Sequence, residues 1–296
     1  MPDRQPWLLM CSPDFYAIEY EINPWMSRSR GANRARAMRQ WHGLYQTLVE
    51  LGAKISLVDP VPGLPDMVFT ANAGMMFRKT FIASRFRPQV RAAEVPYFEK
   101  WFEAAGFQVH RLGADMFFEG AGDALFCGPQ LFGGYRIRSD ARSHQQVASL
   151  IGCEVLPLEL VDPRFYHLDT CFCPLTPTSA IWFPDAFDFY GQQVIRQYVA
   201  DLIEVTPDDA VRFGANAVVV GRTVIETAGC TTLRRAVESR DFTVRELELD
   251  EFLKAGGSAK CLTLRIDGEE AASWAIAAST TGSGPTARPI GEASAG

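Results

Sequence analysis

The stretch GGSAKCLTLRI, residues 256–266, lies near the C-terminus and the rest of the chain is organised around it. Small residues at its start form a flexible turn, and the apolar alternation over 261–266 predicts a strand. The thiol of Cys261 would then lie at a strand entrance, where a reactive sulfur has access. Lys260 is not predicted to activate it, since neighbours in a strand point to opposite faces. The alternative is an inert buried cysteine, which is a common fate of free cysteines.

Upstream of this stretch, the same succession of elements occurs five times. Each round has two strands, a helix and another strand, and the predicted helices begin near residues 33, 90, 141, 186 and 231. This spacing of about 45 to 57 residues is typical of repeat architectures. The strand 261–266 would pair with the first unit and close a ring of five ββαβ units around one cavity. An open α/β sheet with the same element order remains an alternative.

Some predicted elements bear directly on the site. A helix is predicted over 33–51 from its apolar spacing and the glycine that follows, and strands are predicted over 68–77 and 170–175. A single domain is predicted over residues 1–279. The segment 280–296 is low in hydrophobicity, which is typical of a disordered tail.

The composition favours chemistry on small molecules. The hydrophobic content of 47% allows a sizeable core, and the net charge of −6 argues against binding to nucleic acid. Seven cysteines without a CxxC pair, and only four histidines, argue against a disulfide framework or a zinc cluster. No secretory signal and no run of about 18 apolar residues is present, so we expect a cytoplasmic protein without membrane contact.

Charged and amide residues stand at the predicted strand entrances, where their side chains would face the cavity. Carboxylates beside apolar strands are costly to bury unless they are paired, so several converging acids imply a cationic ligand. A guanidinium fits, because its planar fork matches carboxylates two bonds at a time. These entrance residues are Asn23, Asp66, Asn72, Glu119, Asp123, His167, Asp169 and Asn216.

His167 and Asp169 are the strongest pair in this set. Positions i and i+2 of a strand share a face, so an imidazole and an acid could work together there. A structural histidine is the alternative. For Asp66, which follows Pro65, an ordinary turn residue is the alternative. The acids of the segment 119–123 could likewise mark only an exposed loop.

Four motifs in this order resemble the guanidine-modifying pentein superfamily, which includes arginine deiminases, dimethylarginine dimethylaminohydrolases, amidinotransferases and arginine dihydrolases. They are LPDMVFTAN (64–72), EGAGDAL (119–125), HLDT (167–170) and GGSAKCL (256–262). The resemblance covers about residues 7–267 and implies a five-bladed α/β propeller. The segments MCSPDFY (10–16), EINPWM (21–26) and FTANAG (69–74) are most similar to the arginine dihydrolase domain of cyanobacterial bifunctional enzymes, whose second, ornithine-processing domain we do not expect here.

The resemblance implies roles for individual residues. Cys261 would be the nucleophile and His167 the general acid and base, while Asp66, Glu119 and Asp169 would hold the guanidinium and Asp169 would also orient His167. Asp123 is a further candidate contact to the substrate, and either it or Glu119 would reach the guanidinium. Asn72 stands where deiminases have an aspartate, which favours a dihydrolase. The remaining candidates are Arg91 and Arg138 for the amino-acid carboxylate, with surface arginines as the alternative, and Asn23 for the other end of the substrate.

We therefore expect an arginine hydrolase of the dihydrolase type, producing ornithine, carbon dioxide and ammonia through a covalent thiouronium. The chemistry requires no metal and no organic cofactor, and a homo-oligomer is left open. Methylarginine hydrolase, arginine deiminase and amidinotransferase remain alternatives within the family. A non-catalytic module that binds cationic amino acids is the alternative outside the enzymes.

Overall fold

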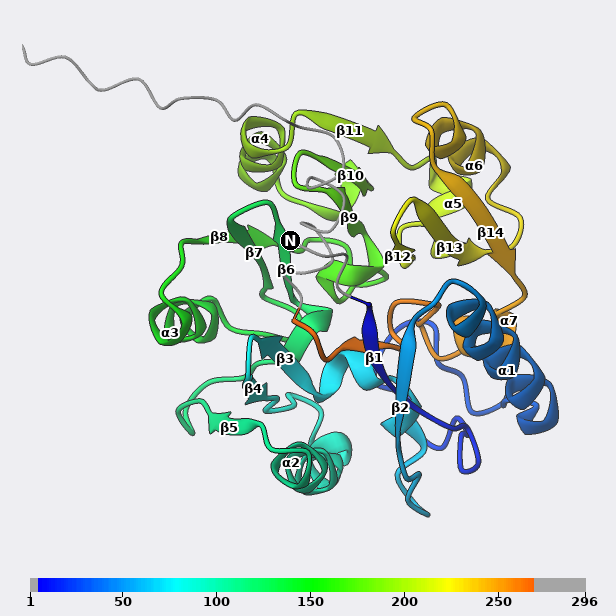
Figure 1. Cartoon of the computed structure of the whole chain (residues 1–296), viewed down its shortest axis with the longest axis vertical. Coiled ribbons are helices and arrows are strands. Elements are labelled where there is room, and N and C mark those ends of the chain that lie inside the picture. The colour runs from blue at the N-terminus through cyan, green and yellow to red at the C-terminus, as the bar shows by residue number, and fades with distance from the viewer. Residues whose placement is uncertain (1–4, 269–296) are drawn as a thin grey trace, which may run out of the picture.

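The computed structural model describes residues 5–268, which form five sheets of three strands each. In four of them an antiparallel pair is followed by a parallel pair, as in β3-β4-β5. The sheets lie around a common centre and the longer helices lie on the outside (Figure 1). The predicted tail 280–296 lies outside the described residues.

The strands and helices occur along the chain in the predicted order. The strands are β1 (Trp7–Cys11), β2 (Lys54–Val58), β3 (Gly74–Phe77), β4 (Thr80–Ala83), β5 (Gln108–Arg111), β6 (Ala124–Cys127), β7 (Gln130–Tyr135), β8 (Val155–Glu159), β9 (Phe172–Thr176), β10 (Ser179–Trp182), β11 (Asp201–Glu204), β12 (Val218–Val220), β13 (Thr223–Thr227), β14 (Thr243–Leu247) and β15 (Leu264–Arg265). The helices are α1 (Arg34–Glu50), α2 (Val95–Ala104), α3 (Ala141–Ile151), α4 (Phe189–Tyr198), α5 (Pro207–Ala210), α6 (Thr231–Glu238) and α7 (Asp250–Leu253).

The last strand closes the set of sheets, as predicted. Strand β15 pairs antiparallel with β1, with Leu264 opposite Leu9, and β1 pairs in parallel with β2. The strand is shorter than the predicted 261–266, because the chain turns until Thr263. Cys261 therefore lies in the turn before the strand.

Helix α1 shows why the local predictions succeed. Asn33 caps it by accepting a hydrogen bond from the backbone N–H of Arg36 at 3.0 Å, which satisfies one of the free donors of the first turn. Ala37, Trp41, Leu44 and Leu48 are buried on one face, at the spacing that α-helical periodicity requires. The helix thus packs one apolar stripe against the sheets.

The segments that precede the first strand of several units differ from prediction. The predicted strand 68–77 begins at the end of one 3₁₀ helix, η1 (Pro65–Val68), and contains a second, η2 (Thr70–Ala73), before β3 begins. The third unit has η4 (Gly120–Gly122) and the fourth has η5 (Leu168–Thr170). In η5 the hydroxyl of Thr170 donates to the carbonyl of His167 at 2.6 Å, a local bond that competes with strand pairing. The strand predictions 68–77 and 170–175 were wrong at their first residues, and the polar residues lie on one-turn helices or at their ends instead.

Apolar side chains fill the space between the sheets and the outer helices. In the second unit the rings of Phe81 and Phe102 stack with centroids 3.8 Å apart, which joins β4 to α2. Within residues 5–268 no helix combines the length and apolar character needed to span a bilayer.

Glu226 on β13 is a buried carboxyl outside the predicted site. Its side chain is fully buried, and neither oxygen has a hydrogen-bond partner among the described residues. Burial, helped by the nearby charges of Glu246 and Asp209, raises its pKa from 4.5 to about 8. The folded protein therefore holds this proton between about pH 4.5 and pH 8, where the unfolded chain has released it. Its contribution to stability is complete below pH 4.5 and is lost as the pH rises through about 8.

We expect Glu226→Gln to remove this loss. One pKa unit corresponds to about 1.4 kcal/mol. The difference in free energy of unfolding between Glu226→Gln and the wild type should therefore shift in favour of the variant by about 2 kcal/mol or more from pH 5 to pH 8. Urea unfolding at the two pH values measures it. Glu248→Gln, at an exposed position, is the matched control and should show no such growth. Parallel pH profiles for the wild type and Glu226→Gln would contradict the prediction.

Candidate active site

A narrow cavity collects side chains from several units at their strand entrances. Two of its contributors are the turn before β15 and η2, and others come from the long loop before α1. The residues lining the cavity are Ile22, Asn23, Met26, Asp66, Phe69, Asn72, Arg91, Arg138, Tyr166, Ala255 and Cys261. Predicted site residues that are far apart in the sequence thus meet at one place.

The thiol of Cys261 lies between two opposing influences. Its Sγ–H donates to Asp169 Oδ2 at 3.4 Å, and Sγ accepts a hydrogen bond from Asn216 Nδ2 at 3.2 Å. Burial and the Asp169 carboxylate raise the pKa of the thiol well above its ordinary value, while the Ser258 backbone N–H and the Asn216 amide act in the other direction. Without a ligand the sulfur is therefore held as a neutral thiol at neutral pH.

The imidazole of His167 is paired with Glu119. Nε2 of His167 lies 2.7 Å from Glu119 Oε2, and the same oxygen accepts a bond from Arg138 Nη1 at 3.0 Å. Burial opposes ionisation of Glu119, but Arg138 and His167 outweigh it and lower the pKa of the carboxyl to about 2. Glu119 is thus an anion at every physiological pH. It is suited to stabilise a protonated imidazole.

The predicted partnership of His167 and Asp169 on one strand face is wrong. The two residues lie at η5, with His167 capping it and Asp169 inside it, so the two-residue strand period does not apply. The orienting place beside the imidazole is taken by Glu119, and Asp169 faces the sulfur of Cys261 instead. Glu119 thus has the orienting role that sequence spacing suggested for Asp169.

Asp123 accepts hydrogen bonds through both of its oxygens. Its Oδ2 accepts from the Ser139 hydroxyl at 2.6 Å and its Oδ1 from the backbone N–H of Leu168 at 3.0 Å. The side chain is fully buried behind the cavity and is not among the residues lining it. Burial raises its pKa to about 6. Its two oxygens hold Ser139 and the start of η5 in position, and its contact with the substrate stays a prediction.

The two predicted arginines are buried, which excludes the surface alternative. Arg91 forms two 2.8 Å bonds to the carboxylate of Glu94 and donates Nη1 to Asn72 Oδ1 at 3.0 Å. Arg138 donates Nη2 to the carbonyl of Ile22 at 2.7 Å, besides its bond to Glu119. Both line the cavity. Each guanidinium is balanced by an internal acid, as burial of a charge requires.

Three further predicted residues line the same cavity. Asp66 is buried and lies 3.9 Å from Arg91 Nε; burial raises its pKa, although Arg91 and Tyr20 oppose the shift. Asn72 Nδ2 is 3.5 Å from His167 Nδ1, which connects the imidazole to the cavity wall. Asn23 donates to the Ala255 carbonyl at 2.9 Å and accepts from the backbone N–H groups that follow it.

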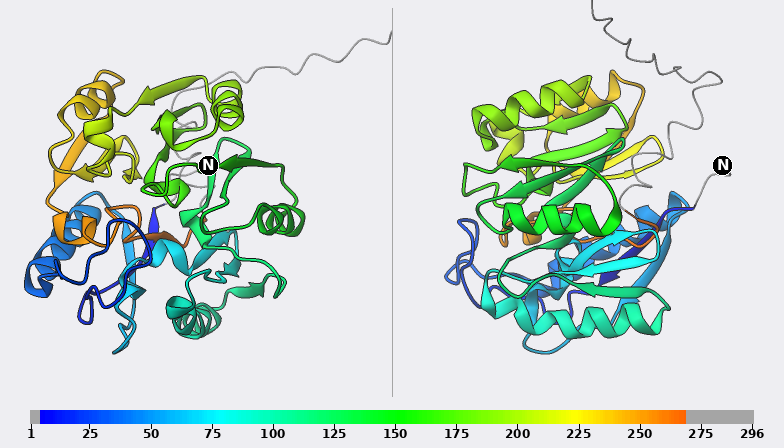
Figure 2. Two further views of the ribbon diagram at one scale, coloured as in Figure 1. Left: turned by 180° about the vertical axis from the view of Figure 1, so that it is seen from behind. Right: turned by 90° about the vertical axis from the view of Figure 1, so that its left-hand side faces the viewer.

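The loop before α1 lies across this end of the molecule. Seen from behind, the blue segment between β1 and α1 crosses in front of the neighbouring units (Figure 2). The Trp25 indole donates to the carbonyl of Arg164 at 2.7 Å, and Ile22 accepts from Arg138. These two bonds fasten the loop to units distant in the sequence, and the loop forms one wall of the cavity.

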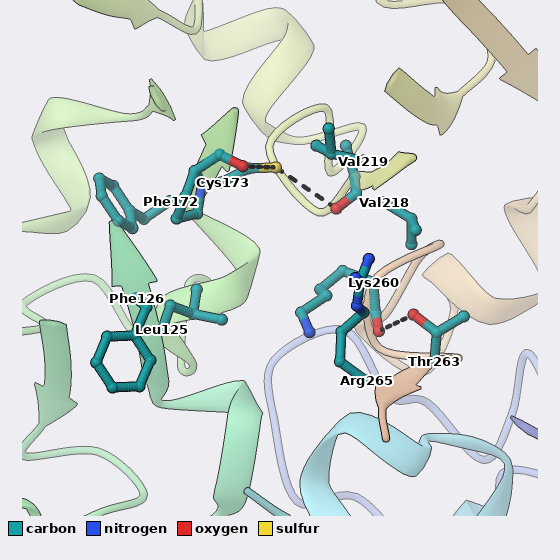
Figure 3. A pocket seen from close by; sticks show the side chains of 11 residues that line it. Leu125, Phe126, Phe172, Cys173, Val218, Val219, Lys260, Thr263 and Arg265 are labelled. Carbon is teal, nitrogen blue, oxygen red and sulfur yellow. Dashed lines mark hydrogen bonds between the residues drawn. The ribbon is translucent and has the colours of Figure 1, made fainter. Parts of the chain in front are cut away.

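Lys260 belongs to a different pocket from Cys261. Its side chain extends into a hollow that also contains Phe172, Val218 and Arg265 (Figure 3). The backbone at this point is a turn and not the predicted strand. The interpretation that the lysine does not activate its neighbour nevertheless agrees with the separate pockets.

Some site residues were missed or left without a role by sequence reasoning. Tyr166 donates its hydroxyl to the Gly256 carbonyl at 2.7 Å, and Arg138 lies 4.6 Å from the centre of its ring. Its position directly before His167 was the available signal. For Glu94, the ion-pair partner of Arg91, the sequence indicates a role in the site only through its position three residues after Arg91 on a helix. Asn216 was noted at a strand entrance, but its contact with the sulfur joins residues 45 apart.

Comparison with known proteins identifies relatives over almost the whole described chain. The family model described as N,N-dimethylarginine dimethylhydrolase, eukaryotic, matches residues 17–267. The bifunctional arginine dihydrolase/ornithine cyclodeaminase ArgZ of a Synechocystis species is 47% identical over 264 residues, which is 88% of this chain and 37% of that protein. This chain thus spans little more than a third of that relative's length. A dimethylarginine dimethylaminohydrolase of Mycobacterium tuberculosis is 37% identical, covering 87% of this chain and 84% of the relative.

A solved structure agrees with the architecture. The crystal structure of the N-terminal domain of ArgZ, described as an arginine dihydrolase and bound to substrate as a cysteine-to-serine mutant, superposes with a TM-score of 0.86 at 46% identity. The match covers 89% of this chain and 99% of that domain.

Proposed function

This chain belongs to the N,N-dimethylarginine dimethylhydrolase family, and from that premise we propose that it is an arginine hydrolase of the dihydrolase type. Its substrate is free arginine. The overall reaction takes arginine and two waters to ornithine, carbon dioxide and two ammonia. The second activity in the names of the bifunctional relatives is not assigned to this chain.

The observation that carries the proposal is that the lining residues Cys261, Asn72 and Arg138 connect one cavity to the imidazole of His167 and to the acids Asp169 and Glu119. Asp169 contacts Sγ of Cys261, and Glu119 contacts His167, which reaches the cavity through Asn72. The acids create an anionic site for a flat cation. The positive charge of a bound guanidinium stabilises the buried thiolate. The thiolate in turn can attack the guanidinium carbon, so substrate and nucleophile activate one another.

The first half of the reaction forms a covalent intermediate. The thiol proton of Cys261 passes to His167, and the imidazolium that forms is stabilised by Glu119 at 2.7 Å. The thiolate attacks the guanidinium carbon, and His167 returns the proton to the departing nitrogen, which leaves as ammonia. The product is a thiouronium on Cys261. Asp66 and Asp169 hold the cation in plane.

The second half hydrolyses this intermediate. His167 removes a proton from water, the hydroxide attacks the thiouronium carbon, and the carbon–sulfur bond breaks. The ureido group that results is neutral. In the dihydrolase reaction it stays bound and undergoes a second hydrolysis, which releases the second ammonia, carbon dioxide and ornithine.

The remaining groups serve recognition. Arg91 and Arg138 hold the substrate carboxylate by exchanging part of their bonds to Glu94 and Glu119, and Asn23 binds the other polar end. The arrangement of five small sheets supports the finer assignment of a five-bladed α/β propeller. We further propose one catalytic domain over 1–279 and a cytoplasmic location.

Product analysis tests the function. Purified protein supplied with arginine should release ornithine and two ammonia per arginine consumed, measured by mass spectrometry and an ammonia assay. Citrulline with one ammonia would instead identify a deiminase, and transfer of the amidino group to an added amine an amidinotransferase. Saturable arginine binding without turnover would identify a binding module. Any of these outcomes overturns the dihydrolase proposal.

Dimethylarginine is the second candidate substrate, because a relative named for that activity is 37% identical. Supplying asymmetric dimethylarginine separates the two. Citrulline with dimethylamine, formed faster than ornithine is formed from arginine, would favour this candidate.

Asn72→Asp is expected to change the product. The neutral ureido group can accept a bond from the Asn72 amide, but a carboxylate would repel its oxygen and release it early. Citrulline should therefore rise from a trace to a major product, measured by mass spectrometry after complete consumption of arginine. Asn33→Asp is the matched control, because aspartate also caps a helix and Asn33 lies outside the cavity. An unchanged ornithine yield would contradict the role of this amide.

A further inference from the structure

Asn216 makes four side-chain hydrogen bonds at the nucleophile and its surroundings. It is fully buried and precedes β12, in a different unit from the turn that carries Cys261. Its Nδ2 donates to Sγ of Cys261 at 3.2 Å and to the backbone carbonyl of Asp169 at 2.8 Å. Its Oδ1 accepts from the backbone N–H groups of Ser258 at 2.9 Å and Cys261 at 3.2 Å.

These contacts fix the orientation of the amide. Both backbone groups on one side are donors, so the atom facing them must be the oxygen. The opposite side then presents NH₂, with one hydrogen toward a carbonyl and the other toward the sulfur. A rotated amide would place its NH₂ against two N–H groups and its oxygen against a carbonyl. The sulfur therefore always faces a donor.

The sulfur needs this donor more as a thiolate than as a thiol. The Asp169 carboxylate lies 3.4 Å from Sγ and disfavours negative charge there, and burial does the same. A hydrogen bond to an ionised acceptor is stronger than one to a neutral acceptor, so the amide stabilises the reactive form selectively. It also requires no rearrangement during the reaction, because four contacts already hold it.

We propose that Asn216 is a catalytic residue that stabilises the thiolate of Cys261 through Nδ2 and aligns the nucleophile's turn through Oδ1. This inference rests on the proposed function for its catalytic consequence. Its effect on the sulfur itself is independent of which guanidine compound is the substrate. The two claims can therefore fail separately.

The experiment uses Asn216→Ser and Asn216→Asp in the full chain. Serine is neutral and its hydroxyl stands one bond closer to the backbone, so the donor to the sulfur is lost without added charge. Aspartate keeps the shape and the acceptor oxygen but replaces the donor. Thr263→Val is the matched control, since it removes a 3.2 Å bond to Lys260 within the same turn without touching the sulfur.

The primary readout is the rate of iodoacetamide alkylation at Cys261, mapped by mass spectrometry as a function of pH. The fraction of Cys261 present as thiolate falls about tenfold for each unit by which the pKa of the thiol rises. A thiolate of higher pKa is also a better nucleophile, which offsets part of this loss. The alkylation rate in Asn216→Ser should therefore fall by about three- to tenfold. The kcat for arginine should fall by about tenfold or more, with KM within about threefold. Thr263→Val should stay within about twofold in both.

An alkylation rate in Asn216→Ser within about twofold of the wild type overturns the inference, even if kcat falls. A slowing confined to Asn216→Asp overturns it as well, because added charge would then be the cause. If Asn216→Ser does not fold, the test uses Asn216→Asp alone. An alkylation rate of Cys261 in Asn216→Asp equal to that of the wild type then also overturns the inference. Slowed alkylation in a chain that does not act on arginine preserves this inference and removes the proposed function.

Discussion

Cys261→Ser is expected to lower kcat for arginine by about a thousandfold or more while arginine still binds. The hydroxyl of serine is a much weaker acid than a thiol, so His167 forms the anionic nucleophile from it far less readily than it forms the thiolate. The acids and arginines that line the cavity remain in place. Loss of turnover with retained binding would assign the sulfur to chemistry and not to recognition.

Ammonia release measures the loss, and calorimetric titration with arginine measures the retained affinity. Cys153→Ser is the matched control, because Cys153 is partly exposed and lies outside the cavity. It should keep nearly wild-type activity. Turnover by Cys261→Ser within tenfold of the wild type would contradict a thiolate mechanism altogether.

The second large effect is expected at the imidazole. His167→Gln removes the group that gives a proton to departing ammonia and takes one from water, and general acid–base catalysis contributes about a hundredfold to ten-thousandfold. The carboxylate of Glu119 keeps its bond to Arg138, so the cavity should not collapse. We expect kcat to fall by that factor with little change in KM.

Steady-state kinetics measures this loss, and mass spectrometry of the quenched protein shows whether a covalent adduct builds up on Cys261. His42→Gln is the matched control, since His42 is exposed on α1. A rate for His167→Gln within tenfold of the wild type would be incompatible with both proton transfers assigned to this residue. The basal fold is checked by unfolding in urea.

Much of the architecture can be derived from the chain alone. The helix over 33–51, the fivefold repetition of strands and helices, and the return of the last strand to the first unit all rest on local periodicity, caps and spacing. Such signals extend over a few residues or at most one repeat, so they can be read directly from the sequence. The identity of the guanidine-modifying family also follows from motifs of this kind.

What only the tertiary structure decided is which polar groups touch. The contacts of Cys261 with Asp169 and of His167 with Glu119 join positions 92 and 48 residues apart. Sequence spacing gave Asp169 the orienting role of Glu119, and it gave no sign that Asp123 holds η5 and Ser139 in position. It also could not find the bond from Asn216 to the sulfur. One-turn helices before the strands redirect these side chains, and the closure of the sheets brings them together, so their partners depend on the whole fold and not on any segment of it.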